Sequence, residues 1–137
     1  MLEVSIAEIK AEDTWHIRHR VMWPDMPFDF VKIDNDLEGK HFGLFVEDSL
    51  ISIVSLFINN DEAQFRKFAT EVSEQGKGYG THLLQYIMDE AQSLKLKKIW
   101  CNARVDKTDY YEKFGLTKTD KTYVKGGIDF VILEKNI

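Results

Sequence analysis

A glycine-rich segment in the middle of the chain offers the clearest candidate for chemistry. It consists of Gln75-Gly76-Lys77-Gly78-Tyr79-Gly80-Thr81, and its three glycines alternate directly before an amphipathic stretch. Glycine tolerates positive φ and lets a ligand approach the backbone closely. A helix N-terminus adds unpaired N–H groups and a partial positive charge. The segment therefore predicts an anion site suited to phosphate, to which Lys77 could add a charged hydrogen bond. A flexible turn that only caps the helix is the alternative interpretation.

The spacing of these glycines excludes two well-known phosphate motifs. A P-loop needs four residues between its glycines and then Gly-Lys-Ser/Thr, an order that this segment lacks. The dinucleotide fingerprint spaces its glycines by one and then two residues. Counted from Gly76 the third glycine comes one residue early, and counted from Gly78 the third position is Leu83. A role as a nucleotide-phosphate binder is therefore disfavoured.

The spacing of apolar residues differs before and after this segment, which predicts different secondary structure on its two sides. Before it, three apolar runs joined by short polar turns predict an antiparallel meander, with strands at His41–Val46, Leu50–Ile58 and Ala63–Val72. After it, an apolar stripe at 3.6-residue spacing predicts an amphipathic helix. The stripe consists of Leu83, Leu84, Ile87, Met88, Ala91 and Leu94. Lys98–Arg104 then predicts a strand that returns parallel to the strand before the helix.

The N-terminal part of the chain predicts one strand and one helix. Alternating apolar residues indicate a short strand around Val4–Ile9, and Ala11–Trp23 has helical spacing that Pro24 ends. Residues 25–40 are acidic and poorly periodic, so we expect a loop there with at most one short helix. The N-terminal part thus contributes one strand to the sheet.

The C-terminal part predicts a short helix and a hairpin. Lys107–Phe114 fits the helix, with Gly115 as its C-terminal cap. Lys118–Val124 and Ile128–Leu133 fit two strands around a glycine turn. The whole order predicts an α+β (mixed α/β) fold: a mixed, mostly antiparallel sheet of about six to seven strands flanked by helices, with a central parallel β-α-β unit.

Length and composition bound the remaining possibilities. The chain has 137 residues, of which 44% are hydrophobic and 30% charged, so a single domain over residues 1–137 is expected. A net charge of −5 argues against nucleic acid as a partner. Cys101 is the single cysteine, and His16 and His19 lack a third ligand, so no metal is expected. With no apolar run of about 20 residues and no signal peptide, we expect a cytoplasmic protein without a membrane partner.

A second motif gives the sequence a resemblance to a known family. Asn102-Ala103-Arg104 closes a predicted strand, and Asp109-Tyr110-Tyr111-Glu112-Lys113-Phe114-Gly115-Leu116 follows it. Gln75–Gly80 fits the pattern Gln/Arg-x-x-Gly-x-Gly/Ala. With both motifs, and with the order of elements over nearly the whole chain, the sequence resembles the GNAT superfamily of acetyl-CoA-dependent N-acetyltransferases. It departs from the family pattern at Lys107, where alanine is usual.

The resemblance implies a cofactor and the residues that bind it. Backbone amides of the glycine segment would bind the pyrophosphate of acetyl-CoA, the expected co-substrate. The strand ending near Val72 would splay from the strand at Asn102, and the pantetheine arm would lie in the gap. Asn102 could hydrogen-bond this arm, or only form a turn. The expected cofactor-binding residues are Val72, Gln75, Gly76, Lys77, Gly78, Tyr79, Gly80, Thr81 and Asn102.

The same resemblance suggests catalytic residues: Tyr111, Glu71 and the backbone amide of Val72, which would polarise the thioester carbonyl. Tyr111 is the candidate general acid, since a phenol pKa near 10 is close to a thiol pKa near 8.5; a packed aromatic is the alternative. The general base stays open among Glu71, Glu74 and His41. An amine whose pKa is lowered in the cleft would need no base at all.

The implied function is transfer of an acetyl group to a primary amine of a small molecule or peptide by direct attack. An acyl-CoA-binding sensor or interaction module without transferase activity is the alternative, and a homodimer is possible. Charge is uneven along the chain: residues 1–64 hold 5 basic and 13 acidic side chains, and residues 65–137 hold 13 and 10. This predicts that an anionic cofactor binds the second half and that the first half attracts a cationic amine.

Overall fold

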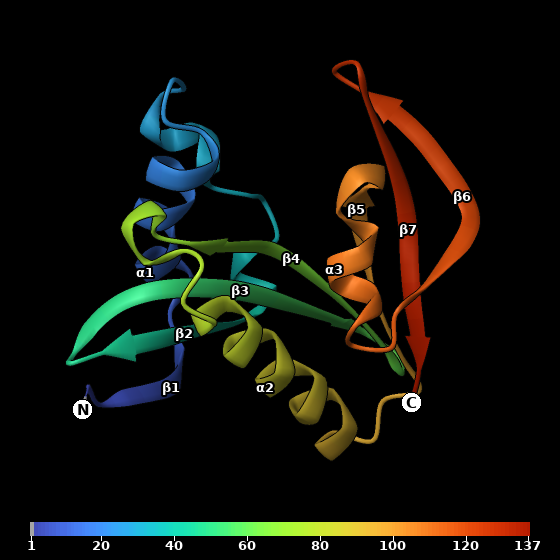
Figure 1. The fold of residues 1–137 in the computed structure, drawn as a ribbon, viewed down its shortest axis with the longest axis horizontal. Helices are drawn as coiled ribbons and strands as arrows, with labels where there is room; N and C mark the ends of the chain where they lie inside the picture. The colour runs from blue at the N-terminus through green and yellow to red at the C-terminus, as the bar shows by residue number, and fades with distance from the viewer. Residues whose placement is uncertain (1) are drawn as a thin grey trace.

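The computed structural model describes residues 2–137, which form a seven-stranded sheet in the order β1-β2-β3-β4-β5-β7-β6 (Figure 1). Within these residues only β4 and β5 pair in parallel; all other neighbours are antiparallel. The predicted mixed sheet with a central parallel unit is therefore confirmed. The strands are β1 Val4–Ile9, β2 Lys40–Val46, β3 Ser49–Asn59, β4 Glu62–Thr70, β5 Lys98–Arg104, β6 Thr117–Lys125 and β7 Ile128–Asn136.

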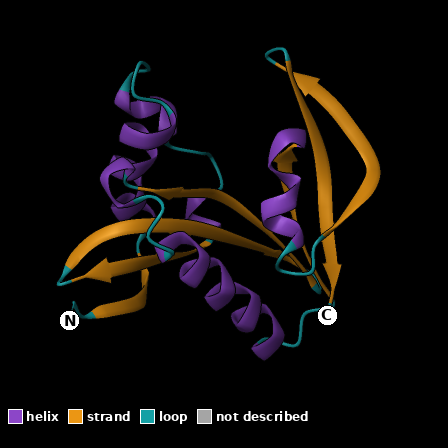
Figure 2. Ribbon diagram, viewed as in Figure 1, coloured by secondary structure: helices purple, strands orange, loops and turns teal. Residues whose placement is uncertain are grey.

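Helices lie against both faces of the sheet (Figure 2). On one face, α2 (Tyr79–Ser93) and α3 (Thr108–Glu112) pack on the main core. On the other, α1 (Ala11–Ile17) continues into a π-helical turn at Arg18–Met22 and forms a smaller core, to which it contributes Ile17. No helix in the described part of the chain is long and apolar enough to cross a membrane.

The apolar stripe of α2 faces the sheet as predicted, with one exception. Five members are at most 5% exposed: Leu83, Leu84, Ile87, Met88 and Ala91. Leu94 is 39% exposed, because the helix ends at Ser93 and Lys95 takes a left-handed conformation with φ +59°. Burying such a stripe is the main source of stability for a helix of this length.

Two predicted elements have different ends in the structure. The strand expected to reach Val72 stops at Thr70, because the chain turns into a 3₁₀ helix at Val72–Glu74. The helix expected over Ala11–Trp23 has regular α geometry only to Ile17. Residues 25–40 hold two further 3₁₀ helices, Phe28–Val31 and Asp36–Glu38, rather than at most one.

The parallel pair β4–β5 is short, and this positions the site. The two strands pair only over Glu62–Gln64 and Lys98–Trp100. Beyond Gln64 and Trp100 they run apart, and β5 instead pairs along its whole length with β7 (Figure 1). The predicted splay is therefore present. It opens toward the carboxyl ends of the two strands, where ligands commonly bind parallel units.

Candidate functional site

The glycine segment forms the tight entry into α2. Gly76 and Gly78 have φ values of +82° and +86°, and Gly78 is the N-cap of the helix. A Cβ at either position would meet no atom within 4 Å, so the space beside both glycines is open. Gly80 has another role, because a Cβ there would lie 3.0 Å from the Thr70 Oγ1 and 3.1 Å from the Phe68 ring. Gly80 thus lets α2 approach β4 closely.

A cavity of about 470 Å³ lies in front of this segment. It is bounded by the end of β4, the glycine turn and the first turn of α2, and Tyr110 of α3 closes one side. The Gln75 Nε2 donates a 2.9 Å hydrogen bond to the Thr70 carbonyl, which ties the turn to the strand. The first turn of α2 contains no acidic residue. A helix N-terminus with open glycine backbone beside it fits the phosphates of CoA.

Among the described residues, the ion pair that Lys77 forms is with Glu74 and not with a group inside this cavity. Its Nζ lies 3.0 Å from the Glu74 Oε2. That hydrogen bond, with the charge of Glu74, raises the pKa of Lys77, which is therefore a cation at neutral pH. A bound phosphate would compete with Glu74 for the ammonium group.

Two adjacent tyrosines on α3 lie beside the splay. The Tyr110 hydroxyl is 3.0 Å from the Thr81 Oγ1, and its ring stacks on Phe68 at 6.4 Å between centroids. Tyr111 is half-buried with its ring 5.8 Å from Phe65. Burial raises the pKa of Tyr111, and the neighbouring Cys101 and Tyr110 add to this, so the phenol stays protonated at neutral pH. The sequence analysis included Tyr110 in its second motif but did not assign it to the site.

Cys101 is a core residue. It is 2% exposed on β5, and burial raises the pKa of its thiol to about 12. A thiol with that pKa is neutral at physiological pH and therefore a poor nucleophile. This supports direct attack by the acceptor over a route through a cysteine intermediate.

The candidate bases have different surroundings. Glu71 accepts hydrogen bonds from the Arg20 Nε at 3.3 Å and Nη2 at 3.0 Å, and its side chain is 25% exposed. His41 is 3% exposed, and its ring nitrogens lie 2.7 Å from the Ser55 Oγ and from the Asp36 carbonyl oxygen. Glu71 is therefore partly accessible to solvent beside the end of β4, whereas His41 is buried.

The two remaining candidates, the backbone amide of Val72 and the side chain of Asn102, lie at the edges of the gap between β4 and β5. Val72 is 70% exposed in the turn that follows β4. Asn102 is exposed between the buried Cys101 and Ala103, so its side chain points to the face opposite α2. From there Asn102 can reach a cofactor arm only through the gap between β4 and β5.

A buried polar cluster supports the face opposite α2. The Arg18 Nη1 and Nη2 each donate a 2.9 Å hydrogen bond to the Asp36 carboxylate, and Nη2 also donates to the Ser55 Oγ at 3.0 Å. The Trp15 Nε1 donates to the same carboxylate at 3.0 Å. Burial by itself would raise the pKa of Asp36, but these hydrogen bonds and one from the Ile33 amide hold it below its ordinary value. Sequence analysis missed this cluster.

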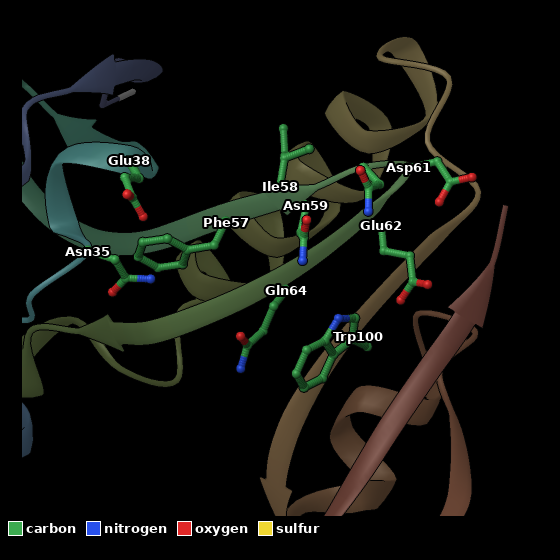
Figure 3. A pocket seen from close by; sticks show the side chains of 10 residues that line it. Asn35, Glu38, Phe57, Ile58, Asn59, Asp61, Glu62, Gln64 and Trp100 are labelled. Atoms are coloured by element: carbon green, nitrogen blue, oxygen red, sulfur yellow. The ribbon is translucent and has the colours of Figure 1, made fainter.

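A second groove, of about 510 Å³, lies on the face opposite α2 (Figure 3). Gln64 and Trp100, the last pair before the strands part, lie on one wall, and Phe57 and Glu38 lie further along (Figure 3). Asp61 and Glu62 stand at its outer end. Among residues 2–137, no three His, Cys, Asp or Glu side chains gather as a metal-binding group.

Comparison with known proteins gives a consistent result. A sequence profile described as "Acetyltransferase (GNAT) domain" matches residues 31–137. The chain is 29% identical to the uncharacterized N-acetyltransferase YitI of Bacillus subtilis strain 168, over all of this chain and 97% of that protein.

Solved structures share the fold. The ribosomal-protein-S18-alanine N-acetyltransferase of Escherichia coli superposes with a TM-score of 0.81 at 18% identity, covering 98% of this chain and 94% of that one. A GNAT family acetyltransferase of Elizabethkingia anophelis with acetyl-CoA bound gives a TM-score of 0.78 at 16% identity, with 98% of each chain covered. The glycine turn, the splayed strands and the sequence match agree: the chain belongs to the GNAT family of acetyltransferases.

Proposed function

We propose that the protein transfers an acetyl group from acetyl-CoA to a primary amine by direct attack. The observation that supports this most strongly is the open backbone at Gly76 and Gly78, which lies at the N-terminus of α2 and beside the gap between β4 and β5. In this arrangement one end of the site binds phosphate and the other end admits an extended arm. The whole chain, residues 1–137, would act as the catalytic domain.

The phosphate end of the cofactor is proposed to lie on the α2 face of the sheet, with its arm in the gap between β4 and β5. The residues proposed to hold it are Val72, Gln75, Gly76, Lys77, Gly78, Tyr79, Gly80, Thr81 and Asn102. Tyr110 is added to them, because its hydroxyl bonds Thr81 and its ring closes the cavity. When bound, acetyl-CoA supplies an activated thioester. The chain fixes its position and excludes water from one side.

Tyr111 and Glu71 are the proposed catalytic side chains, with the backbone amide of Val72 as a donor to the carbonyl. Tyr111 keeps its proton at neutral pH, so its phenol can donate a hydrogen bond where negative charge develops on a leaving sulfur. Glu71 is the proposed base because its carboxylate is a quarter exposed at the end of β4, whereas His41 is enclosed. A water molecule could relay the proton to Glu71.

The test is an assay of CoA release over a panel of primary amines, run beside thermal unfolding with acetyl-CoA. Acetyl-CoA should raise the melting temperature, because a ligand that binds only the native state stabilises it. ATP and NAD at equal concentration should raise it much less. Release of CoA that depends on an added amine would support the transferase. A melting shift without release for any amine would instead support the acyl-CoA-binding sensor, for which the enclosed His41 and the paired Glu71 are the supporting observations.

A further inference from the structure

The face of the sheet opposite the cofactor cavity has a bulge in β4 at the point where the strands part. Arg66 pairs with Ser55 and Ala69 pairs with Ile53, so Lys67 and Phe68 together face the single residue Val54. Lys67 takes a left-handed conformation with φ +56°, which is costly for a non-glycine residue. The bulge begins two residues after Gln64, the last residue of β4 that pairs with β5.

Two consecutive cationic residues, Arg66 and Lys67, lie at this bulge. The Arg66 guanidinium lies 5.5 Å from the centre of the Phe57 ring, on the face opposite α2. Lys67 is half-buried. Burial lowers the pKa of Lys67, and the charges of Arg66, Arg18 and Lys125 lower it further, whereas the charge of Asp36 raises it.

Arg66 and Lys67 form no close ion pair with any described residue. Within residues 2–137, no Asp or Glu oxygen lies within 4.0 Å of a nitrogen of Arg66, Lys67 or Lys125, whereas Arg18 is paired with Asp36. Like charges repel one another more strongly in a partly desolvated environment than in water. An anion bound among them would remove that repulsion and accept charged hydrogen bonds.

From these positions we propose that the acceptor carries a carboxylate besides the amine that is acetylated, and that Arg66 and Lys67 bind it. This rests on the proposed function. The glycine turn and α2 occupy one side of the opening between β4 and β5, so an acceptor amine must approach from the other side. That side is the face on which Arg66 lies, and the bulge with Arg66 and Lys67 is next to the opening.

The groove of Figure 3 supports this choice over a polycationic acceptor. Asp61 and Glu62 lie at its outer end, beside the paired part of the strands and before the opening, whereas Glu38 lies at the other end near Phe57 (Figure 3). Asp61 is half-exposed and already 3.5 Å from the Lys97 Nζ, and Glu38 and Glu62 are exposed. Exposed carboxylates of this kind bind a cation weakly. Arg66 and Lys67 are less exposed and nearer to the opening.

The experiment compares matched amines in the CoA-release assay. Glycine, β-alanine and γ-aminobutyrate are measured beside methylamine, ethylamine and propylamine, with spermidine as the polycationic arm. Wild-type protein should prefer at least one amino acid over its matched amine by about 10-fold or more in kcat/KM, as a charged hydrogen bond gives. Lys67→Gln and Arg66→Gln should remove most of this preference, mainly through KM, and leave the rate with plain amines within about twofold.

The control is Lys95→Gln. Lys95 is also a lysine with positive φ, +59°, but it is exposed and lies in the connection between α2 and β5. It should retain the preference, which separates loss of charge at the bulge from loss of a strained lysine. A higher rate with spermidine than with every amino acid would overturn the proposal, and so would a preference that survives both bulge variants. Binding of acetyl-CoA without CoA release for any amine would instead overturn the proposed function, and this inference with it.

Discussion

The two faces of the sheet are built in different ways. The face proposed to bind the cofactor depends mainly on one continuous segment, Gln75–Thr81, whose glycines and helix N-terminus act together and to which Tyr110 adds a contact at Thr81. The opposite face depends on contacts between distant parts of the chain: Arg18 to Asp36, and Ser55 to both Arg18 and His41. A local site tolerates change elsewhere in the chain. A site assembled from distant residues depends on the packing of the fold, so mutations on the two faces should affect different properties.

The largest effect is expected from Asp36→Ala. This change leaves the Arg18 charge buried at 0% exposure, with its Nε already lacking a hydrogen-bond partner. Breaking a buried ion pair by removing one partner costs about 3–5 kcal/mol, a large part of the stability of a domain this size. Urea denaturation should show this loss. Asp29→Ala is the control, because its carboxylate is 84% exposed beside Lys32 and should cost at most about 1 kcal/mol. Equal losses would contradict a special role for the buried cluster.

The pH dependence of this stability follows from the lowered pKa of Asp36. A carboxylate whose pKa is lower in the folded state stabilises the fold above its unfolded pKa of about 3.9. The contribution is lost as the pH falls through the folded-state pKa. The difference in unfolding free energy between wild type and Asp36→Asn should therefore be constant near pH 7 and shrink below about pH 4. A difference that grows on acidification would be inconsistent with this.

Gly78→Glu should weaken the binding of acetyl-CoA, and it should lower the stability of the fold no more than a matched change elsewhere. Its φ of +86° strains any side chain by about 1–2 kcal/mol, and the new carboxylate would stand in the space assigned to phosphate. Gly126→Glu is a matched control, since Gly126 has φ +60° and open space beside it but lies in the β6–β7 turn. Both variants should lose similar stability. Only Gly78→Glu should weaken acetyl-CoA binding, by about 10-fold or more in calorimetry. Equal affinities would remove this segment from the site.

Tyr111→Phe should lower the rate of transfer more than the affinity for acetyl-CoA. Removing a general acid typically costs about 100-fold or more in kcat. Tyr110→Phe is the comparison on the same helix: it removes the hydrogen bond to Thr81 and should weaken cofactor binding modestly, with a smaller effect on kcat. If both variants changed kcat equally, Tyr111 would have no distinct role.

The sequence predicted the local structure of the face proposed to bind the cofactor, because the determinants of that structure are local. The turn, the helix stripe and the strand order follow from spacing and glycine chemistry, and the structure confirms them with β4 shortened to Thr70. The opposite face could not be predicted in the same way. Asp36 lies in a segment without periodicity, and no residue near it in the sequence predicts its ion pair with Arg18. The sequence analysis also missed the bulge at Lys67, although the apolar alternation of Ala63 and Phe65 resumes one residue late, at Phe68.

The charge count shows the same limit. Division of the chain at residue 64 predicted an acidic acceptor side. Glu38, Asp61 and Glu62 of the acidic half line the groove opposite α2, but Arg66 of the basic half lies on the same face. A strand contributes side chains to both faces of a sheet, so a count along the chain cannot assign charge to a face. The relevant charge is the local one at the opening of the strands.

The smallest effect is expected from Arg20→Gln, which tests Glu71 on the boundary between the two faces. The pair is exposed, with 55% of the Arg20 side chain and 25% of the Glu71 side chain accessible, so its loss should cost less than about 1 kcal/mol in urea denaturation. If Glu71 is the base, Arg20→Gln should keep measurable CoA release, because the carboxylate is still present, whereas Glu71→Gln should lower kcat at least 10-fold. Glu74→Gln is the control for a neighbouring acid, and its kcat should match wild type. A Glu71→Gln rate equal to that of Glu74→Gln would leave the amine to lose its proton without a side-chain base.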